Sequence, residues 1–283
     1  MDYKKFHAQY LEEGCIKIEN FLTSAEVEEL RKGVSEAVKN MPEENSPVFS
    51  VYGAGKSRAA DEYYLSSGDK IGYFFENDAF DMNGKLIVEK KEALNKIGYA
   101  LHWWNPFFKK HTFSQKIKDL LRNFQYKDPV IVQSMIIFKK PKIGEIVRPH
   151  QDSTFLYTEP PTCIGLWFPL EDATLENGCL WFVPGSHKEE IHQRFVRNPT
   201  EDPLLIMKGK VPDYADEEYV SVPAKKGDCV IIHGSVVHKS GRNTTKVART
   251  VYTYHLVEKE AEWSKENWCQ PTERLPFPSI YHN

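Results

Sequence analysis

Short runs of β-branched and aromatic residues follow one another from about residue 129, and they restrict the possible folds more than any other feature of the chain. Clusters of Pro, Gly, Asn and Asp separate the runs, and no helical pattern lies between them. Strands without helical crossovers are typical of an antiparallel sandwich or barrel. The runs are PVIVQSMIIF, CIGLWFPL, GCLWFVPG, YVSVPA, DCVIIHG, SVVHKS and RTVYTYHLV.

The first part of the chain is predicted to be more helical. Ile16 and Ile18 alternate with polar neighbours, which indicates a short strand. A helix is expected to begin at Thr23 or Ser24, because Thr23 and Glu26 have the spacing of a capping box. We therefore predict a strand followed by an amphipathic helix near the N-terminus.

Two later segments of this part carry further predictions. The aromatic patch YYLSSGDKIGYFFE lies in a loop-rich stretch, so about residues 52–80 are predicted to form a lid or a substrate wall. Residues 91–104 show a helical pattern, and on that local pattern Lys96 is a solvated helix residue. The face of this predicted helix is formed by Leu94, Ile97 and Leu101.

Composition narrows the class of protein. The chain has 283 residues and contains 37 Lys and Arg residues against 40 Asp and Glu residues, a formal net charge of −3, so no basic field favours nucleic acid. No uninterrupted apolar run of about 18 residues exists to span a membrane. The five cysteines form no Cys-x-x-Cys pair and are expected to be free thiols. No secretory or peroxisomal signal is evident, and we expect a cytoplasmic protein.

A His-x-Asp pair, His150 and Asp152 in RPHQDSTF, is the first candidate for chemistry. In an extended segment, residues two apart point to one face, so both side chains would reach a common point. His238, in the later run SVVHKS, supplies a second imidazole. Two histidines and one carboxylate fit the facial triad of non-haem Fe(II) oxygenases, although the same three ligands also fit a catalytic zinc site.

Arg249 begins the strand run that follows His238. Strand parity places it on one face with Val251, Thr253 and His255. A guanidinium inside a barrel needs an anionic partner, and the far carboxylate of 2-oxoglutarate would provide one. A structural salt bridge is the alternative for this arginine.

Other residues leave their roles open. His233 abuts a glycine and is expected to end its strand as a structural histidine, His187 lies in a turn, and His102 is a further possible ligand. Arg148 has no predicted role. Neither a phosphate-binding Gly-rich motif nor a Gly-x-Ser-x-Gly elbow occurs in the chain.

The motifs together resemble the phytanoyl-CoA dioxygenase family over nearly the whole chain. The segments that carry the resemblance are NKIGYALH, VQSM, PHQDSTFLYTEP, LENGCLWFVPGSH, GSVVHKS and RTVYTYHL, in that order. The resemblance implies a mostly β protein with a double-stranded β-helix, also called a jelly roll or cupin-like barrel, and flanking α-helices. We expect one domain over residues 1–283, with a helical flank over about 1–125, the barrel over about 126–260 and a C-terminal extension.

The resemblance also implies the site. The iron ligands would be His150, Asp152 and His238, the residues that would also be catalytic. Further residues would contact the cosubstrate. For Lys96, the resemblance overrules the local prediction of a solvated helix residue. Strand parity independently pairs Gln133 with Met135, and His238 with Ser240. The added contacts are Lys96, Met135, Gln151, Trp167, Ser240 and Arg249.

The implied reaction couples decarboxylation of 2-oxoglutarate by O₂, giving succinate and CO₂, to hydroxylation of a small or lipid-like substrate. Fe(II) would be the metal, and ascorbate would support turnover. Relatives that halogenate have a small residue at the metal carboxylate, whereas Asp152 fills this position and favours hydroxylation. The alternative is a non-catalytic jelly-roll module that binds 2-oxoglutarate or metal. The prime substrate, acceptance of a CoA thioester and the oligomeric state are left open.

Overall fold

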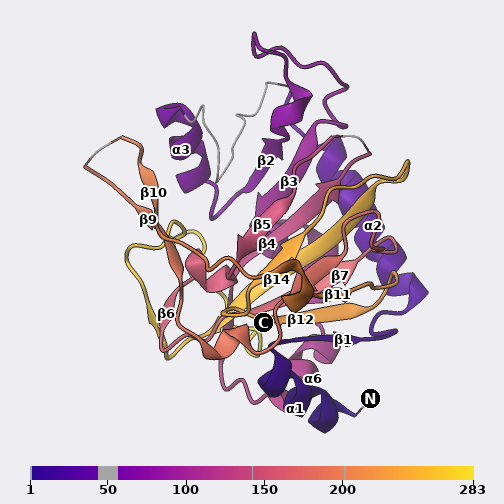
Figure 1. The fold of residues 1–283 in the computed structure, drawn as a ribbon, viewed down its shortest axis with the longest axis vertical. Helices are drawn as coiled ribbons and strands as arrows, with labels where there is room; N and C mark the ends of the chain where they lie inside the picture. Colours follow the sequence, from indigo (N-terminus) through magenta and orange to yellow (C-terminus); the bar gives the residue numbers. More distant parts are fainter. Residues whose placement is uncertain (1, 44–56, 142, 201) are drawn as a thin grey trace.

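A seven-stranded antiparallel sheet forms the larger layer of the protein (Figure 1). The computed structural model describes residues 2–43, 57–141, 143–200 and 202–283. The strand order is β1-β12-β7-β14-β4-β3-β2. Their bounds are β1 (Cys15–Ile18), β12 (Cys229–His233), β7 (Ile164–Pro169), β14 (Arg249–Glu258), β4 (Pro129–Lys139), β3 (Leu94–Tyr99) and β2 (Ile71–Phe75).

A four-stranded antiparallel sheet, in the order β11-β8-β13-β5, forms the second layer. All seven strand runs predicted from the sequence fall on strands of the two larger sheets. Two additional strand pairs flank these layers. The bounds are β11 (Val220–Val222), β8 (Leu180–Phe182), β13 (His238–Ser240) and β5 (Val147–His150), with the pairs β10 (Leu205–Gly209) and β9 (Gln193–Arg197), and β15 (Glu262–Trp263) and β6 (Thr158–Glu159).

The two larger sheets enclose a shared apolar core. Trp167 and Val251 of the seven-stranded sheet pack in one buried cluster with Leu180 and Phe182 of the four-stranded sheet. Successive side chains of β14 point to opposite sides of the seven-stranded sheet, as in any strand. Val251 thus faces the core between the two sheets, whereas Tyr252 is buried on the opposite side of its sheet, against the helices. This is the predicted jelly roll.

Helices cover the outer face of the seven-stranded sheet. Figure 1 shows α1 and α6 beside β1, and a second buried cluster joins helical Leu30 and Phe108 to Tyr252 of β14. The predicted capping box is confirmed, since Thr23 Oγ1 accepts from the Glu26 amide and the Glu26 carboxylate accepts from the Thr23 amide. The helices are α1 (Tyr3–Glu13), α2 (Ser24–Lys39), α3 (Arg58–Leu65), α4 (Leu101–Trp104), α5 (Pro106–Thr112) and α6 (Gln115–Asn123).

The helix predicted over residues 91–104 is wrong for most of its length, because residues 94–99 form strand β3. A β-bulge explains the error. Phe74 pairs with Lys96 but Phe75 pairs with Leu94, so Asn95 is an extra residue in the strand. The extra residue brings Leu94 and Ile97 into the same core cluster at a spacing of three, which imitates a helical stripe.

The N-terminal flank supplies strands as well as helices. β1, β2 and β3 all join the seven-stranded sheet. Within the predicted lid, residues 52–56 lie outside the described residues, and the rest forms α3, β2 and their connections. All five cysteines are free, as predicted, and all five are buried. None of the helices in the described ranges has both the length and the apolar character needed to cross a membrane.

Candidate metal centre and active site

The three predicted metal ligands lie together, two on strands of the four-stranded sheet and one in the turn that follows β5. His150 ends β5, His238 begins β13, and the two are direct partners across these strands. Asp152 begins the short 3-10 helix η2 (Asp152–Thr154). Its Oδ1 lies 3.6 Å from His150 Nε2 and 3.7 Å from His238 Nε2. One ligand atom from each residue lies within 4.8 Å of the others, so a single ion fits all three.

Backbone carbonyls orient both imidazoles. His150 Nδ1 lies 2.9 Å from the Arg148 carbonyl oxygen, and His238 Nδ1 lies 3.1 Å from the Val236 carbonyl oxygen. A carbonyl only accepts, so each Nδ1 carries a proton, and each Nε2 is the ring nitrogen that faces Asp152. With Nδ1 held by a carbonyl, Nε2 is the nitrogen of each ring that is available to a metal ion.

A fourth side chain, His255, contacts the other oxygen of Asp152. His255 Nε2 lies 3.1 Å from Asp152 Oδ2, and Gln133 Nε2 lies 3.1 Å from His255 Nδ1. The amide nitrogen donates to Nδ1, which leaves the ring proton on Nε2 facing the carboxylate. A Cβ at Gly165 would lie 3.3 Å from Asp152 Oδ2, so glycine leaves room for the contact. Oδ2 thereby faces His255, while Oδ1 faces the two histidines.

The charge states suit a divalent cation. Burial raises the pKa of Asp152, but the nearby His255 and His238 outweigh it and hold that pKa well below its usual range. Burial lowers the pKa of His238 to about 4, and His150 acts in the same direction. An ionised carboxylate and a neutral imidazole are the forms that bind metal.

A cavity of about 210 Å³ opens onto His150 and Asp152. Polar groups lie close to the ligands and in its wall, and aromatic rings supply much of the remaining surface. Such a mixture suits a small ligand with a charged end beside an apolar group. The aromatic residues are Tyr64, Phe75, Tyr99, Phe155 and Trp268, and the polar residues beyond the ligands include Glu76, Asn95, Lys96, Gln133 and His255.

Lys96 and Met135 both line this cavity. Lys96 is therefore not the solvated helix lysine that its local sequence predicts. Its Nζ lies 5.4 Å from the ring centre of Phe74 and 5.5 Å from that of Tyr99. Burial lowers the pKa of Lys96 to about 8, and the carboxylate of Glu76 opposes that shift.

Three other predicted contacts, Trp167, Ser240 and Arg249, form a buried group that we call the Arg249 cluster. Ser240 Oγ and Arg249 Nη2 both donate to the Gly178 carbonyl oxygen, at 2.8 and 3.0 Å. The Arg249 guanidinium carbon lies 5.4 Å from the centre of the Trp167 ring. Within the described residues, the lining of the 210 Å³ cavity does not include this cluster.

The Gln151 side chain points away from the metal ligands. Its amide nitrogen donates to the carbonyls of Glu190 and Ser235, at 3.1 and 2.8 Å, and its oxygen accepts from the His192 amide at 2.9 Å. This side chain fastens the metal-binding turn to two other loops. A contact of Gln151 with cosubstrate would therefore come from its backbone.

The three other histidines that the sequence offered as possible ligands lie outside the metal centre. His233 ends β12, as predicted, and its Nδ1 accepts from the Ser235 amide. His102 is buried and its Nδ1 lies 2.8 Å from Ser134 Oγ. His187 lies in a short 3-10 turn, with Nε2 3.1 Å from the Leu11 carbonyl. None of the three belongs to the group of possible metal ligands found among the described residues.

Sequence reasoning gave no role to His255, Glu76 or Lys139. Strand parity places His255 on the same face as Arg249, and this alone would have predicted that its side chain points into the barrel. Glu76 follows β2 and accepts from Asn95 at 2.8 Å, a contact that depends on the β3 bulge. Lys139 faces Arg249 only because of the β4–β14 register, which the sequence does not specify.

Comparisons with known proteins agree with this architecture. The sequence profile of the family described as phytanoyl-CoA dioxygenase matches residues 10–251. Phytanoyl-CoA dioxygenase domain-containing protein 1 of Danio rerio is 46% identical over 287 residues, which cover 99% of this chain and 97% of that protein.

Two solved structures share the fold at low sequence identity. The epimerase SnoN, in complex with Fe³⁺, alpha ketoglutarate and nogalamycin RO, has a TM-score of 0.63 and 18% identity, with 98% of each chain covered. EctD from S. alaskensis, with 2-oxoglutarate and 5-hydroxyectoine, has a TM-score of 0.64 and 16% identity, with coverage of 98% of this chain and 86% of that chain.

Proposed function

The chain belongs to the phytanoyl-CoA dioxygenase family, and on that premise we propose that it is an Fe(II)- and 2-oxoglutarate-dependent hydroxylase. The observation that carries the proposal is the convergence of His150, Asp152 and His238, the first two of which line a cavity. Two imidazoles and one carboxylate leave coordination positions open, an arrangement typical of non-haem Fe(II) oxygenases. When bound, iron and cosubstrate supply the oxidising chemistry: O₂ and 2-oxoglutarate are converted to succinate and CO₂ as the substrate gains a hydroxyl group.

The chain's own residues fix the ligands. His150 and His238 direct their Nε2 atoms toward Asp152, because the carbonyls of Arg148 and Val236 hold their Nδ1 atoms. Asp152 presents Oδ1 because His255 contacts Oδ2. A carboxylate at this position occupies the place that a halide would need, which supports hydroxylation.

Arg249 is proposed to pair with the carboxylate of 2-oxoglutarate remote from the metal. Its guanidinium is buried, and its Nε has no hydrogen-bond partner among the described residues. A buried cation with unused donors favours an anionic ligand, and a guanidinium can bind a carboxylate through two parallel hydrogen bonds. The other proposed cosubstrate contacts are Lys96, Met135, the Gln151 backbone, Trp167 and Ser240.

The substrate is proposed to place a small or lipid-like group against the aromatic wall. Phe155 and Trp268 line the cavity beside the metal ligands and limit the access of water. The part of the predicted lid that the structure describes contributes Tyr64, Phe75 and Glu76 to the same wall. These side chains would position the C–H bond that reacts.

Turnover with different metals tests the proposed function. Purified protein with Fe(II), 2-oxoglutarate and ascorbate in air is expected to release succinate and CO₂ in equal amounts, with further stimulation by the true substrate from a metabolite and lipid pool. Zn(II) in place of Fe(II) is expected to give none. Tight 2-oxoglutarate binding without succinate under every pool would instead identify a binding module, and Zn(II)-dependent hydrolysis would identify a zinc hydrolase.

Replacing His255 by leucine is expected to weaken metal binding about 10- to 100-fold, because a side chain that orients a metal ligand contributes about that much to affinity. Competition with a chelator measures the dissociation constant without turnover. His255→Gln can still donate to Asp152 and is expected to lose less. His187→Leu is the matched control, since His187 lies outside the metal centre. Unchanged metal affinity in His255→Leu would refute a role in orienting Asp152.

A further inference from the structure

Two buried basic side chains are direct neighbours inside the β core. Lys139 ends β4, Arg249 begins β14, and the two are partners in the antiparallel register. Directly opposed residues of such a pair project from the same face of the sheet. Arg249 is 2% exposed and Lys139 is 5% exposed, so neither charge is solvated to any large extent.

The polar contacts of both side chains end on backbone carbonyls. Lys139 Nζ donates to the carbonyl oxygens of Gly241 at 2.6 Å and Glu145 at 3.3 Å. Arg249 Nη2 donates to the Gly178 carbonyl at 3.0 Å. An ammonium has three donors and a guanidinium has five, so both cations retain unused donors.

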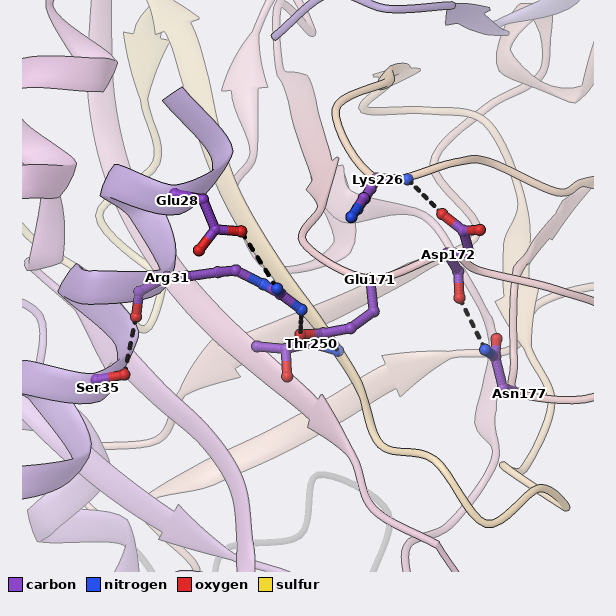
Figure 2. Close-up of polar contacts among 8 residues, drawn as sticks. All are labelled: Glu28, Arg31, Ser35, Glu171, Asp172, Asn177, Lys226 and Thr250. Atoms are coloured by element: carbon purple, nitrogen blue, oxygen red, sulfur yellow. Dashed lines mark hydrogen bonds and ion pairs between the residues drawn. The ribbon is translucent and has the colours of Figure 1, made fainter. Parts of the chain in front are cut away.

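No carboxylate of the described residues forms an ion pair with either cation, and Glu171 and Glu76, whose charges act on them, have other partners. Glu171 binds Arg31 Nη2 at 2.7 Å and the Thr250 amide at 2.6 Å; Figure 2 shows it between these two residues. Glu76 accepts from Asn95 at 2.8 Å. The local positive charge is therefore left for a ligand to neutralise.

The two cations also raise each other's free energy. Burial lowers the pKa of Lys139 to about 7, with the Arg249 charge as the next cause, while Glu76 opposes the shift and Arg242 adds to it. Burial lowers the pKa of Arg249 to about 10. An anion bound between them would relieve both the desolvation and the repulsion.

Gly178 keeps this place compact. A Cβ there would lie 2.7 Å from Lys139 Cδ and 2.7 Å from the Gly241 carbonyl oxygen, and its φ of +90° favours glycine. The loop before Gly178 is anchored, because Asn177 Nδ2 donates to the Asp172 carbonyl at 2.8 Å and the Asp172 carboxylate accepts from the Lys226 amide (Figure 2). The Gly178 carbonyl thereby holds Ser240 and Arg249 beside the lysine stem.

We propose that Lys139 is a second cation for the metal-remote carboxylate of the cosubstrate, acting beside Arg249 to select dicarboxylate over monocarboxylate 2-oxo acids. The inference rests on the proposed function. It adds to the predicted cosubstrate contacts a residue whose charge recognises the second carboxylate.

The test compares the binding of two cosubstrates to wild-type protein and to variants of Lys139. Calorimetry under anaerobic conditions gives the dissociation constants of Fe(II)-loaded protein for 2-oxoglutarate and for 2-oxopentanoate, which has the same chain length and a methyl group in place of the second carboxylate. Lys139→Gln removes the charge but keeps donors for the two carbonyls, and Lys139→Met removes both. Lys140→Met is the matched control, because Lys140 pairs with Glu92 instead.

Both Lys139 variants are expected to bind 2-oxoglutarate about 10- to 100-fold more weakly and to bind 2-oxopentanoate within about twofold of wild type. Lys139→Arg should retain most of the affinity for 2-oxoglutarate. A Lys139→Gln variant that binds 2-oxoglutarate like wild type overturns the proposal, as does an equal loss for both ligands, since either result would assign Lys139 a structural role. Failure of wild-type protein to bind 2-oxoglutarate would instead reject the proposed function.

Discussion

Replacing His150 by alanine is expected to reduce succinate release from 2-oxoglutarate by more than about 100-fold, to the level of protein-free controls. The reason is geometric. His150 supplies one of three ligand atoms that lie within 4.8 Å of one another, and the two that remain cannot hold iron in an open, fixed arrangement. Succinate measured by mass spectrometry in Fe(II)-supplemented reactions gives the result.

The control for this change is another histidine. His187→Ala removes an imidazole that is 3.1 Å from the Leu11 carbonyl and is outside the metal centre, so succinate release is expected to stay within about twofold of wild type. Metal content after dialysis should fall in His150→Ala and not in His187→Ala. Equal succinate release from wild type and His150→Ala would show that the reaction does not depend on this metal centre.

Replacing Arg249 by methionine is expected to raise the dissociation constant for 2-oxoglutarate by about 100- to 1,000-fold, because truncating one partner of a buried, hydrogen-bonded charge pair costs about 3–4 kcal/mol. Metal affinity should change little, since Arg249 belongs to the buried Arg249 cluster and not to the metal ligands. The separation of the two affinities distinguishes loss of a cosubstrate contact from general unfolding.

An exposed arginine provides the comparison. Arg122 on α6 pairs with Asp119 at the surface, and Arg122→Met is expected to leave both affinities unchanged. The thermal midpoint of each variant, measured without ligand, reports the structural contribution of the arginine. If Arg249→Met binds 2-oxoglutarate as tightly as wild type does, the buried guanidinium is a structural group and the anion site lies elsewhere.

The β core was predictable because its signals are local. Each strand run carries its own β-branched and aromatic residues, and turn residues separate the runs, so the antiparallel layers follow from patterns of a few residues. The His150 and Asp152 pair is local in the same sense. The alternation of side chains within β14 places Arg249 and His255 on one face, and it requires no knowledge of the neighbouring strands.

The parts that sequence reasoning missed depend on register between distant strands. The partnership of Lys139 with Arg249 exists because β4 and β14 pair in one particular alignment. The strand β3 was missed because the bulge at Asn95 places Leu94 and Ile97 in one cluster, three residues apart. A spacing of three residues between apolar positions occurs both in a bulged strand and in a helix, and only the strands that pair with the segment distinguish the two.

The electrostatic consequences of burial were equally hidden from the sequence. Lys96 reads as an ordinary helix lysine, yet β3 carries it into the cavity and burial lowers its pKa to about 8. Burial and the nearby His150 both lower the pKa of His238, and His150 comes close only when β5 and β13 pair. Residue type supplied the candidates, and strand pairing determined their charge states.

An anaerobic titration of 2-oxoglutarate into Fe(II)-loaded and metal-free protein tests the central claim most directly. If His150, Asp152 and His238 bind iron and the iron binds the cosubstrate, calorimetry should show one site per chain in the loaded protein and an affinity at least about 100-fold lower without metal. Binding of equal strength with and without iron, or no binding to the iron-loaded protein, would contradict the account.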